Sequence, residues 1–512
     1  MTDQPLDQRA TNRSQRPTSQ VFKELMTKGW ADSPVDPAFA ARHPGADAAA
    51  QARRELGKVF PGDRLVFPAG RPKTRSNDTD FRFRPHSAFV HLTGLGLNQE
   101  PEAVLVLDPV ADTDQALAAG LDTHDAVLYL RPPSTKDSPE FYADAATGEF
   151  WVGRRPSLED MARLTGIKTA HLDTLPDALA KDAGLLTLRV IHDADASVSA
   201  QVTQVRQQVG IDVPESTDPA VSPDAKLSEA AAEARLVKDA YGIAQLEAAV
   251  AATVDGFARV IKALPQAKAS PRGERVIEAA FEGWARVDGN GPGYETIAAA
   301  GSHATTLHWT QNTGPVKDGD LLLVDAGVEV DSLYTADITR TVPVNGKFSE
   351  VQRRVWETVV DAADAAFEAA VPGALFRDVH QAAMEVIAER MAEWGLIDVS
   401  AVEALSPEGQ QHRRWMVHGT SHHLGIDVHD CASARKELYL DGRLEPGMVF
   451  TIEPGLYFKP EDLTVPPEYR GIGCRCEDDI LITADGPVNL SAALPRRADA
   501  IEQWMAQLLT GS

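Results

Sequence analysis

The sequence predicts an α+β protein of two domains, from its length and from two different patterns of apolar residues. The chain has 512 residues, more than one hydrophobic core usually supports. In the first half, short apolar runs typical of strands alternate with helical stretches, as in an α/β domain. In the second half, strand-rich segments alternate with helices in an α+β manner. We expect the domains at residues 21–225 and 226–512.

Composition excludes several classes of protein. The chain carries 75 acidic and 50 basic side chains, a formal net charge of −25, which argues against a nucleic-acid partner. Residues 1–20 are polar and lack the apolar core of a secretory signal, so we expect a flexible tail there. No apolar run approaches membrane-spanning length, so no membrane partner is expected. The three cysteines show no disulfide framework, which favours a reducing cytoplasm.

The elements of the first domain follow from short apolar runs. Residues 103–107 and 126–130 are predicted strands, and residues 157–164 are a predicted helix. Residues 212–226 collect three prolines among Ser and Asp residues, which favours a surface connection. We place the domain boundary in this segment.

The second domain opens with a predicted helix and continues with a turn and a second helix. Between Leu236 and Ile261, apolar residues recur at intervals of three, four and seven, and Pro265 is expected to end this helix. Asn345-Gly346 is a tight-turn signal. Ser349 and Gln352 have the spacing of a capping box that opens a helix.

Two acids stand at the ends of predicted strands that could form a hairpin. The apolar run 321–324 leads into Asp325, and Gly327 allows close approach of another strand. Asp337 follows 12 residues later, at the start of the β-branched segment 337–341. Two carboxylates that face each other repel, and a divalent cation between them removes that repulsion. Alone, either acid would more often be a capping or ion-paired residue.

Two further acids have the same setting. Glu453 ends the apolar run 450–452 and precedes turn residues. In segment 473–479 the strand period of two places Arg475 and Glu477 on one face, so Arg475 could orient a neighbouring carboxylate. Cys474 and Cys476 fall on the other face, where we expect buried, inert thiols.

Four histidines crowd residues 418–430, and they are His418, His422, His423 and His429. A lone histidine is usually structural, but this density indicates a site. One neutral imidazole would complete a ligand set with four carboxylates, and the others could move a proton or stabilise an oxyanion. This oxygen-rich set without thiolate suits a pair of divalent metal ions.

Taken in this order, the motifs resemble those of aminopeptidase P, a dinuclear-metal Xaa-Pro aminopeptidase of the pita-bread fold. The matching segments are Tyr294-Glu295-Thr296-Ile297, Leu307-His308-Trp309-Thr310, Asp325-Ala326-Gly327, 337–341, 418–430, Glu453-Pro454-Gly455-Leu456-Tyr457 and 469–479. Their order and context together are highly specific. The resemblance implies a creatinase-like α/β N-terminal domain followed by a pita-bread catalytic domain.

The resemblance also implies a role for each candidate residue. Two metal ions, commonly Mn²⁺, would hold a shared hydroxide that attacks the peptide carbonyl, with Glu453 accepting a proton. His429 would stabilise the tetrahedral intermediate, while His418 and His308 line the site. The implied metal ligands are Asp325, Asp337, His422, Glu453 and Glu477, of which Asp337 and Glu477 bridge the ions. Tyr457 and Arg154 would contact the substrate, which is a peptide with proline in the second position.

The N-terminal half resembles the family through four segments. These are Phe83-Arg84, Phe89, Leu92-Thr93-Gly94 and Glu100-Pro101-Glu102-Ala103. Pro85, His86 and Ala88 depart from the polar or acidic residues usual in relatives. Val90 stands where some relatives carry an aromatic residue that covers the proline from a neighbouring subunit. The resemblance implies a homo-oligomer, a dimer or a tetramer.

Four other interpretations compete with this resemblance. A prolidase, which cleaves Xaa-Pro dipeptides, would share all five ligands and is the closest competitor. A methionine aminopeptidase rarely needs so large an N-terminal domain. A non-catalytic pita-bread binding module would have lost ligands, and a creatinase-like amidinohydrolase needs no metal, so the five retained ligands disfavour both.

Overall fold

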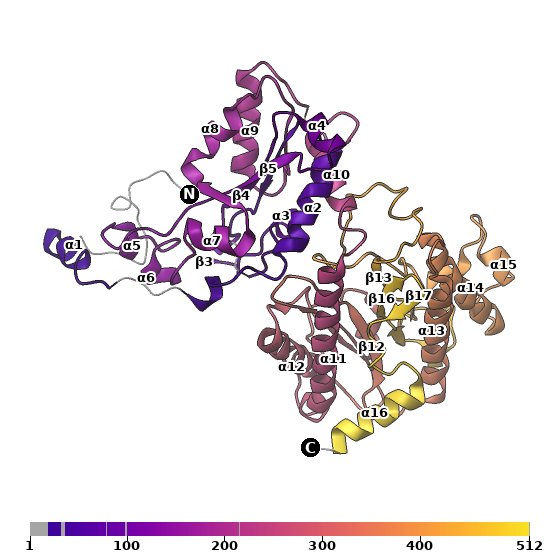
Figure 1. The fold of residues 1–512 in the computed structure, drawn as a ribbon. Coiled ribbons are helices and arrows are strands. Elements are labelled where there is room, and N and C mark those ends of the chain that lie inside the picture. The colour runs from indigo at the N-terminus through magenta and orange to yellow at the C-terminus, as the bar shows by residue number, and fades with distance from the viewer. Residues whose placement is uncertain (1–18, 32–35, 78, 98–99, 215, 511–512) are drawn as a thin grey trace. The chain divides into compact units, whose positions relative to one another are not determined.

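A computed structural model describes residues 19–31, 36–77, 79–97, 100–214 and 216–510 (Figure 1). The backbone divides into two compact units, residues 1–231 and 232–512. The boundary expected at residues 225 and 226 falls inside helix α10 (Pro223–Glu233). Most of the predicted tail at residues 1–20 lies outside the described residues, and Ser19 caps helix α1 (Gln20–Met26).

The first unit is an α/β sandwich around one mixed sheet. Its strand order is β6-β5-β4-β1-β7, antiparallel except for the β5–β6 and β1–β7 pairs. Along β1, Leu65 and Phe67 join one buried cluster and Val66 joins another, as the strand period of two requires. The strands are β1 (Arg64–Pro68), β4 (Val104–Pro109), β5 (His124–Leu130), β6 (Lys168–His171) and β7 (Leu188–Val190), with a separate hairpin of β2 (Thr74–Ser76) and β3 (Thr79–Asp80).

Helices cover both faces of this sheet. Helices α2, α3 and α7 contribute to the cluster of Leu65, and α8 and α9 contribute to that of Val66. The helices are α2 (Ala46–Val59), α3 (Ser87–Thr93), α4 (Thr113–Ala118), α5 (Glu140–Ala143), α6 (Glu149–Val152), α7 (Leu158–Thr165), α8 (Leu175–Ala180) and α9 (Ala196–Gln208). The two strands and the helix predicted at 103–107, 126–130 and 157–164 are confirmed as β4, β5 and α7.

The second unit is built from two helix pairs and several small sheets. Helix α11 packs against α12, and α13 packs against α14, with β12, β13, β16 and β17 between the pairs in Figure 1. The helices are α11 (Ala240–Lys268), α12 (Gly273–Asp288), α13 (Glu350–Ala369), α14 (Phe376–Glu393), α15 (Ala401–Ala404) and α16 (Ala498–Thr510). No helix among the described residues is both long enough and apolar enough to cross a membrane.

The strands of the second unit pair antiparallel. The sheets have the orders β12-β10-β9, β13-β16-β17, β14-β15 and β11-β8. The strands are β8 (Gly291–Pro292), β9 (Ile297–Ala300), β10 (Leu321–Ala326), β11 (Val328–Glu329), β12 (Ile338–Pro343), β13 (Val449–Ile452), β14 (Gly455–Tyr457), β15 (Gly473–Arg475), β16 (Asp478–Thr483) and β17 (Gly486–Asn489). The predicted antiparallel return of the chain from β10 to β12 is confirmed.

One helix end differs from its prediction, and one helix start agrees with it. Helix α11 continues through Pro265 to Lys268, because Leu264 and Ala267 are buried and packing stabilises the last turn despite the lost hydrogen bond. Ser349 and Gln352 form the predicted capping box at the start of α13. The turn before it places Gly346 at φ 79°, where glycine is favoured.

Candidate metal centre

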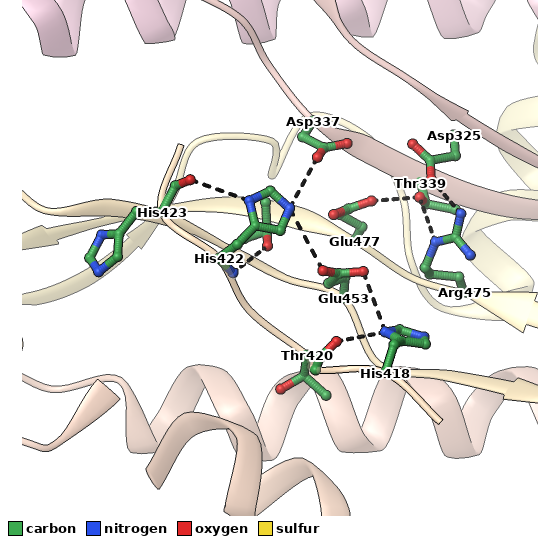
Figure 2. A network of polar contacts seen from close by, with 12 residues as sticks. Asp325, Asp337, Thr339, His418, Thr420, His422, His423, Glu453, Arg475 and Glu477 are labelled. Atoms are coloured by element: carbon green, nitrogen blue, oxygen red, sulfur yellow. Dashed lines mark hydrogen bonds and ion pairs between the residues drawn. The ribbon is translucent and has the colours of Figure 1, made fainter. Parts of the chain in front are cut away.

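Two pairs of strands bring four carboxylates to one region of the second unit (Figure 2). Strands β10 and β12 pair with Asp325 opposite Thr339, and Asp337 immediately precedes β12. A Cβ atom at Gly327 would lie 1.7 Å from the carbonyl oxygen of Ala336, so only glycine lets these strands approach so closely. Asp325 and Asp337 are both buried.

Glu453 and Glu477 lie opposite each other in a second pair of extended segments, which form β13–β16 on one side of the acids and β14–β15 on the other. Ile452 lies opposite Asp478 and Gly455 lies opposite Arg475, so the register is the same on both sides of the acids. The strand expected over residues 473–479 is nevertheless interrupted between β15 and β16, because Pro454 has no N–H group for the ladder. The Thr339 hydroxyl donates to Glu477 Oε2 at 2.6 Å and joins the two strand pairs.

His422 completes the cluster. Its Nε2 atom lies 3.3 Å from Asp337 Oδ2 and 3.7 Å from Glu453 Oε1. Asp337, His422 and Glu477 each offer one ligand atom, and these atoms lie within 4.8 Å of one another. The spacing and the donor types suit a divalent cation bound by oxygen and nitrogen.

The electrostatics of this cluster also favour a cation. Burial raises the pKa of Glu453 to about 7, and burial together with the charges of Asp337, Glu453 and Asp325 raises the pKa of Glu477 well above its usual range. Burial alone would lower the pKa of His422, but Asp337 and Glu453 raise it to about 9. Without a cation, the centre therefore retains protons at neutral pH.

Arg475 links three groups around the centre. Its guanidinium pairs with Asp325 Oδ2, and it donates to Thr339 Oγ1 at 3.2 Å and to Tyr457 Oη at 3.1 Å. Arg475 is buried, so its charge acts in a region of low dielectric constant. The ion pair with Asp325 is the contact expected of a residue that orients this carboxylate.

Two further histidines, His418 and His429, lie beside the cluster. His418 Nε2 lies 2.8 Å from Tyr457 Oη, and burial together with the charge of Arg475 lowers the pKa of His418 to about 4. The His429 ring centroid lies 4.4 Å from that of His422. Burial lowers the pKa of His429, and the charges of His422 and His308 act in the same direction. The structure thus brings His418, His429 and Tyr457 close to the proposed ligands.

His423, the remaining histidine of the segment, points away from the cluster. Its ring stacks on Phe376 with centroids 4.7 Å apart, and burial lowers its pKa to about 3. A structural role fits it best.

Tyr294 contacts two of the proposed ligands, a role that its residue type does not predict. Its hydroxyl lies 2.8 Å from Asp325 Oδ1 and 2.5 Å from Asp337 Oδ1, and can donate to one of them at a time. Tyr294 stands in a segment that carries the family resemblance, and this was its only signal in the sequence. Its hydroxyl ties the two strands of the β10–β12 hairpin together at the centre.

Two predicted residues of the first unit have well-defined surroundings of their own. Arg154 Nη2 lies 3.6 Å from Asp160 Oδ2, and its Nη1 atom is buried with no hydrogen-bond partner among the described residues. Val90 is buried within α3. The substrate contact of Arg154 stays a prediction.

The three cysteines are buried and form no disulfide. Burial raises the pKa of Cys431 and Cys476 to about 12, so both are protonated at neutral pH. Thiols in this state are poor nucleophiles and poor metal ligands.

Comparison with known proteins agrees with this centre. The model of metallopeptidase family M24 matches residues 244–484, and that of the aminopeptidase P N-terminal domain matches residues 49–187. Xaa-Pro aminopeptidase 1 of Streptomyces coelicolor is 47% identical over 509 residues, which cover 99% of this chain and 96% of that protein. The chain belongs to metallopeptidase family M24, in its aminopeptidase P group.

Solved structures show the same likeness across this M24 chain. Aminopeptidase P of Escherichia coli in a low-pH form is 29% identical, with a TM-score of 0.74 over 91% of this chain and 99% of that one. Aminopeptidase PepP of Pseudomonas aeruginosa is 28% identical, with a TM-score of 0.75 over the same shares. The chain therefore has the aminopeptidase P fold, a creatinase-like domain followed by a pita-bread domain, and is a metal-dependent aminopeptidase.

Proposed function

We propose that this M24 chain removes the first residue from peptides with proline in the second position. The observation that carries the proposal is the meeting of four carboxylates and His422 at the β10–β12 and β13–β16 strands, in a chain 47% identical to an Xaa-Pro aminopeptidase along its length. Family M24 implies divalent metal ions. Five residues would hold two of these ions, with Mn²⁺ as the first candidate, and they are Asp325, Asp337, His422, Glu453 and Glu477.

When bound, divalent ions would supply a positive charge that lowers the pKa of a water molecule and favours its attack on a peptide carbonyl. In this proposal Glu453 accepts the proton of that water. His429 stands beside His422 and donates a hydrogen bond to the carbonyl oxygen as negative charge develops. Arg475 keeps the Asp325 carboxylate oriented, because it pairs with Asp325 while Thr339 and Tyr457 hold its other N–H groups.

The remaining residues bind the substrate in this proposal. His418 is uncharged at neutral pH, and its hydrogen bond with Tyr457 fixes its ring. His308, Tyr457 and Arg154 complete the binding surface. Proline has no amide N–H group and a fixed φ angle, so the surface must accept a rigid tertiary amide.

The proposal extends to the setting of the enzyme. A homo-oligomer in the cytoplasm, without nucleic-acid or membrane partners, agrees with a net charge of −25 and with three cysteines that form no disulfide. Gel filtration with light scattering tests the oligomeric state.

A substrate comparison tests the specificity. Manganese-loaded protein should release the first residue of an Xaa-Pro-Pro tripeptide faster than it cleaves an Xaa-Pro dipeptide. Preference for the dipeptide would replace the aminopeptidase proposal with a prolidase. The unloaded protein is the control for metal dependence.

A substitution tests the centre itself. Glu453→Ala should abolish turnover and reduce the bound manganese measured by mass spectrometry, since it removes a proposed ligand and proton acceptor. Glu461→Ala, at an exposed acid, is the matched control. Unchanged metal content and rate in Glu453→Ala would remove this residue from the site.

A further inference from the structure

A buried glutamate outside the metal centre holds the segment that carries His308. Glu274 is the second residue of α12, and its side chain has no exposed surface. This segment, residues 300–314, runs from the last residue of β9 toward β10. His308 lines the substrate site in the proposed function, and the inference drawn here rests on that role.

Four N–H groups of this one segment converge on the Glu274 carboxylate. Oε1 accepts from the backbone of Ala300 at 2.8 Å and from His303 Nδ1 at 2.7 Å. Oε2 accepts from Trp309 Nε1 at 2.9 Å and from the backbone of Gly314 at 2.5 Å. A carboxylate offers about four acceptor sites, so these donors saturate it.

The backbone closes the same contact from the other side. The N–H group of Glu274 donates to the carbonyl oxygen of Gly314 at 3.1 Å, so the two residues exchange two hydrogen bonds. A Cβ atom at Gly314 would lie 2.7 Å from the His303 ring, and that ring stacks on Trp309 with centroids 4.0 Å apart. The segment therefore has little freedom to shift on α12.

His308 belongs to the segment that Glu274 holds. It precedes Trp309 directly, and its own side chain is exposed, so packing does not fix the ring. Burial lowers the pKa of both His418 and His429, and the charge of His308 contributes to both shifts.

We infer that Glu274 is a positioning residue for the aminopeptidase reaction. Through Trp309, His303 and Gly314 it sets where the His308 imidazole stands relative to His418 and His429. Glu274 contacts no proposed metal ligand in any described hydrogen bond, so its effect on turnover runs through this segment.

A double-mutant cycle tests the inference on the manganese-loaded full chain. Glu274→Gln keeps the shape of the side chain but turns an NH₂ group toward two N–H donors. In the wild-type background kcat/KM should fall roughly 10- to 100-fold, as for a small misplacement of a substrate-binding group. In the His308→Ala background the same change should cost less than about 3-fold. Equal losses in both backgrounds would overturn the inference.

Hydrogen exchange gives a readout independent of catalysis. Amides of residues 300–314 should exchange faster in Glu274→Gln, whereas Glu329→Gln, at a buried glutamate bonded to Asn290, should leave them unchanged. Unchanged exchange in Glu274→Gln would overturn the inference. If wild-type protein fails to cleave Xaa-Pro peptides, the proposed function fails. The exchange result alone then decides whether Glu274 holds residues 300–314 in place.

A milder variant keeps the test open if Glu274→Gln does not fold. Trp309→Phe removes one of the four donors and leaves the carboxylate in place. It should lower kcat/KM by about 3- to 10-fold, the equivalent of one hydrogen bond. That loss should also vanish with His308→Ala, and a loss that persists would contradict the inference.

Discussion

Protonation of individual residues should control metal binding at this centre. In the metal-free protein the pKa of His422 is raised to about 9 and that of Glu453 to about 7, so at pH 7 His422 holds a proton and Glu453 holds one about half of the time. A cation needs the neutral imidazole and the ionised carboxylate. The pKa of Glu477 is also raised, so binding at pH 7 should release more than one proton, and metal affinity should rise with pH up to about 9.

Calorimetry checks this prediction. Manganese titrations in two buffers of different ionisation enthalpy give the number of protons released. Identical heats in both buffers would contradict it.

The raised pKa values of Glu453 and His422 also set how the stability of the metal-free protein depends on pH. Both groups favour folding at low pH and lose that contribution as pH rises through 7 for Glu453 and 9 for His422.

The Tyr294 hydroxyl should matter to metal affinity. Tyr294→Phe removes the group that bonds Asp325 and Asp337, and loss of such an outer contact typically weakens binding about 10- to 100-fold. Tyr334→Phe, which removes another buried hydroxyl beside Gly242, is the control. Equal affinities for manganese in the two variants would show that Tyr294 does not support the ligands.

At the scale of elements, the approach of two strands at Gly327 should be intolerant of any side chain. Gly327→Ala forces a Cβ atom to 1.7 Å from the Ala336 carbonyl oxygen, so we expect a loss of about 1–3 kcal/mol or more in the free energy of unfolding. Gly283→Ala is the matched control, since Gly283 lies inside α12 and its Cβ would meet nothing within 4 Å. This control should stabilise the protein by about 0.5–1 kcal/mol.

Denaturant titrations of both variants measure these changes. Opposite signs are the expected result. A neutral Gly327→Ala would mean that the hairpin relaxes without cost.

Local signals made many elements predictable from the sequence. Ser349 and Gln352 mark the start of α13 by their spacing alone, and the apolar run before Asp325 marks β10. The predicted end of α11 at Pro265 is wrong, because burial of the last turn outweighs the hydrogen bond that Pro265 removes. The break between β15 and β16 is not predictable from residues 473–479 themselves, because it arises from Pro454 on the opposite segment.

The same division holds for the centre. Its acids could be found because each stands at or next to one end of a buried strand, a position that is costly for a charge without a partner. Glu274 and Tyr294 could not be found from residue type, since their roles depend on contacts formed only in the folded chain. The roles proposed for the acids and histidines remain predictions until the variants are measured.

For the molecule as a whole, metal should stabilise one unit directly. All five proposed ligands belong to residues 232–512, and each unit has its own buried core. A ligand stabilises the folded state to which it binds. Manganese should therefore slow hydrogen exchange more in β10 and β12 than in β1 and β4, measured by mass spectrometry. Equal protection in both units would contradict this expectation.

The unbroken register between Glu453 and Glu477 limits how this hairpin can change over evolution. A one-residue insertion or deletion in either strand would turn one acid to the opposite face and separate it from its partner. Within this hairpin, changes of length are compatible with the register of the acids in the connection between Tyr457 and Gly473. Among descendants of this gene, that connection should vary in length while the strands that flank it keep theirs.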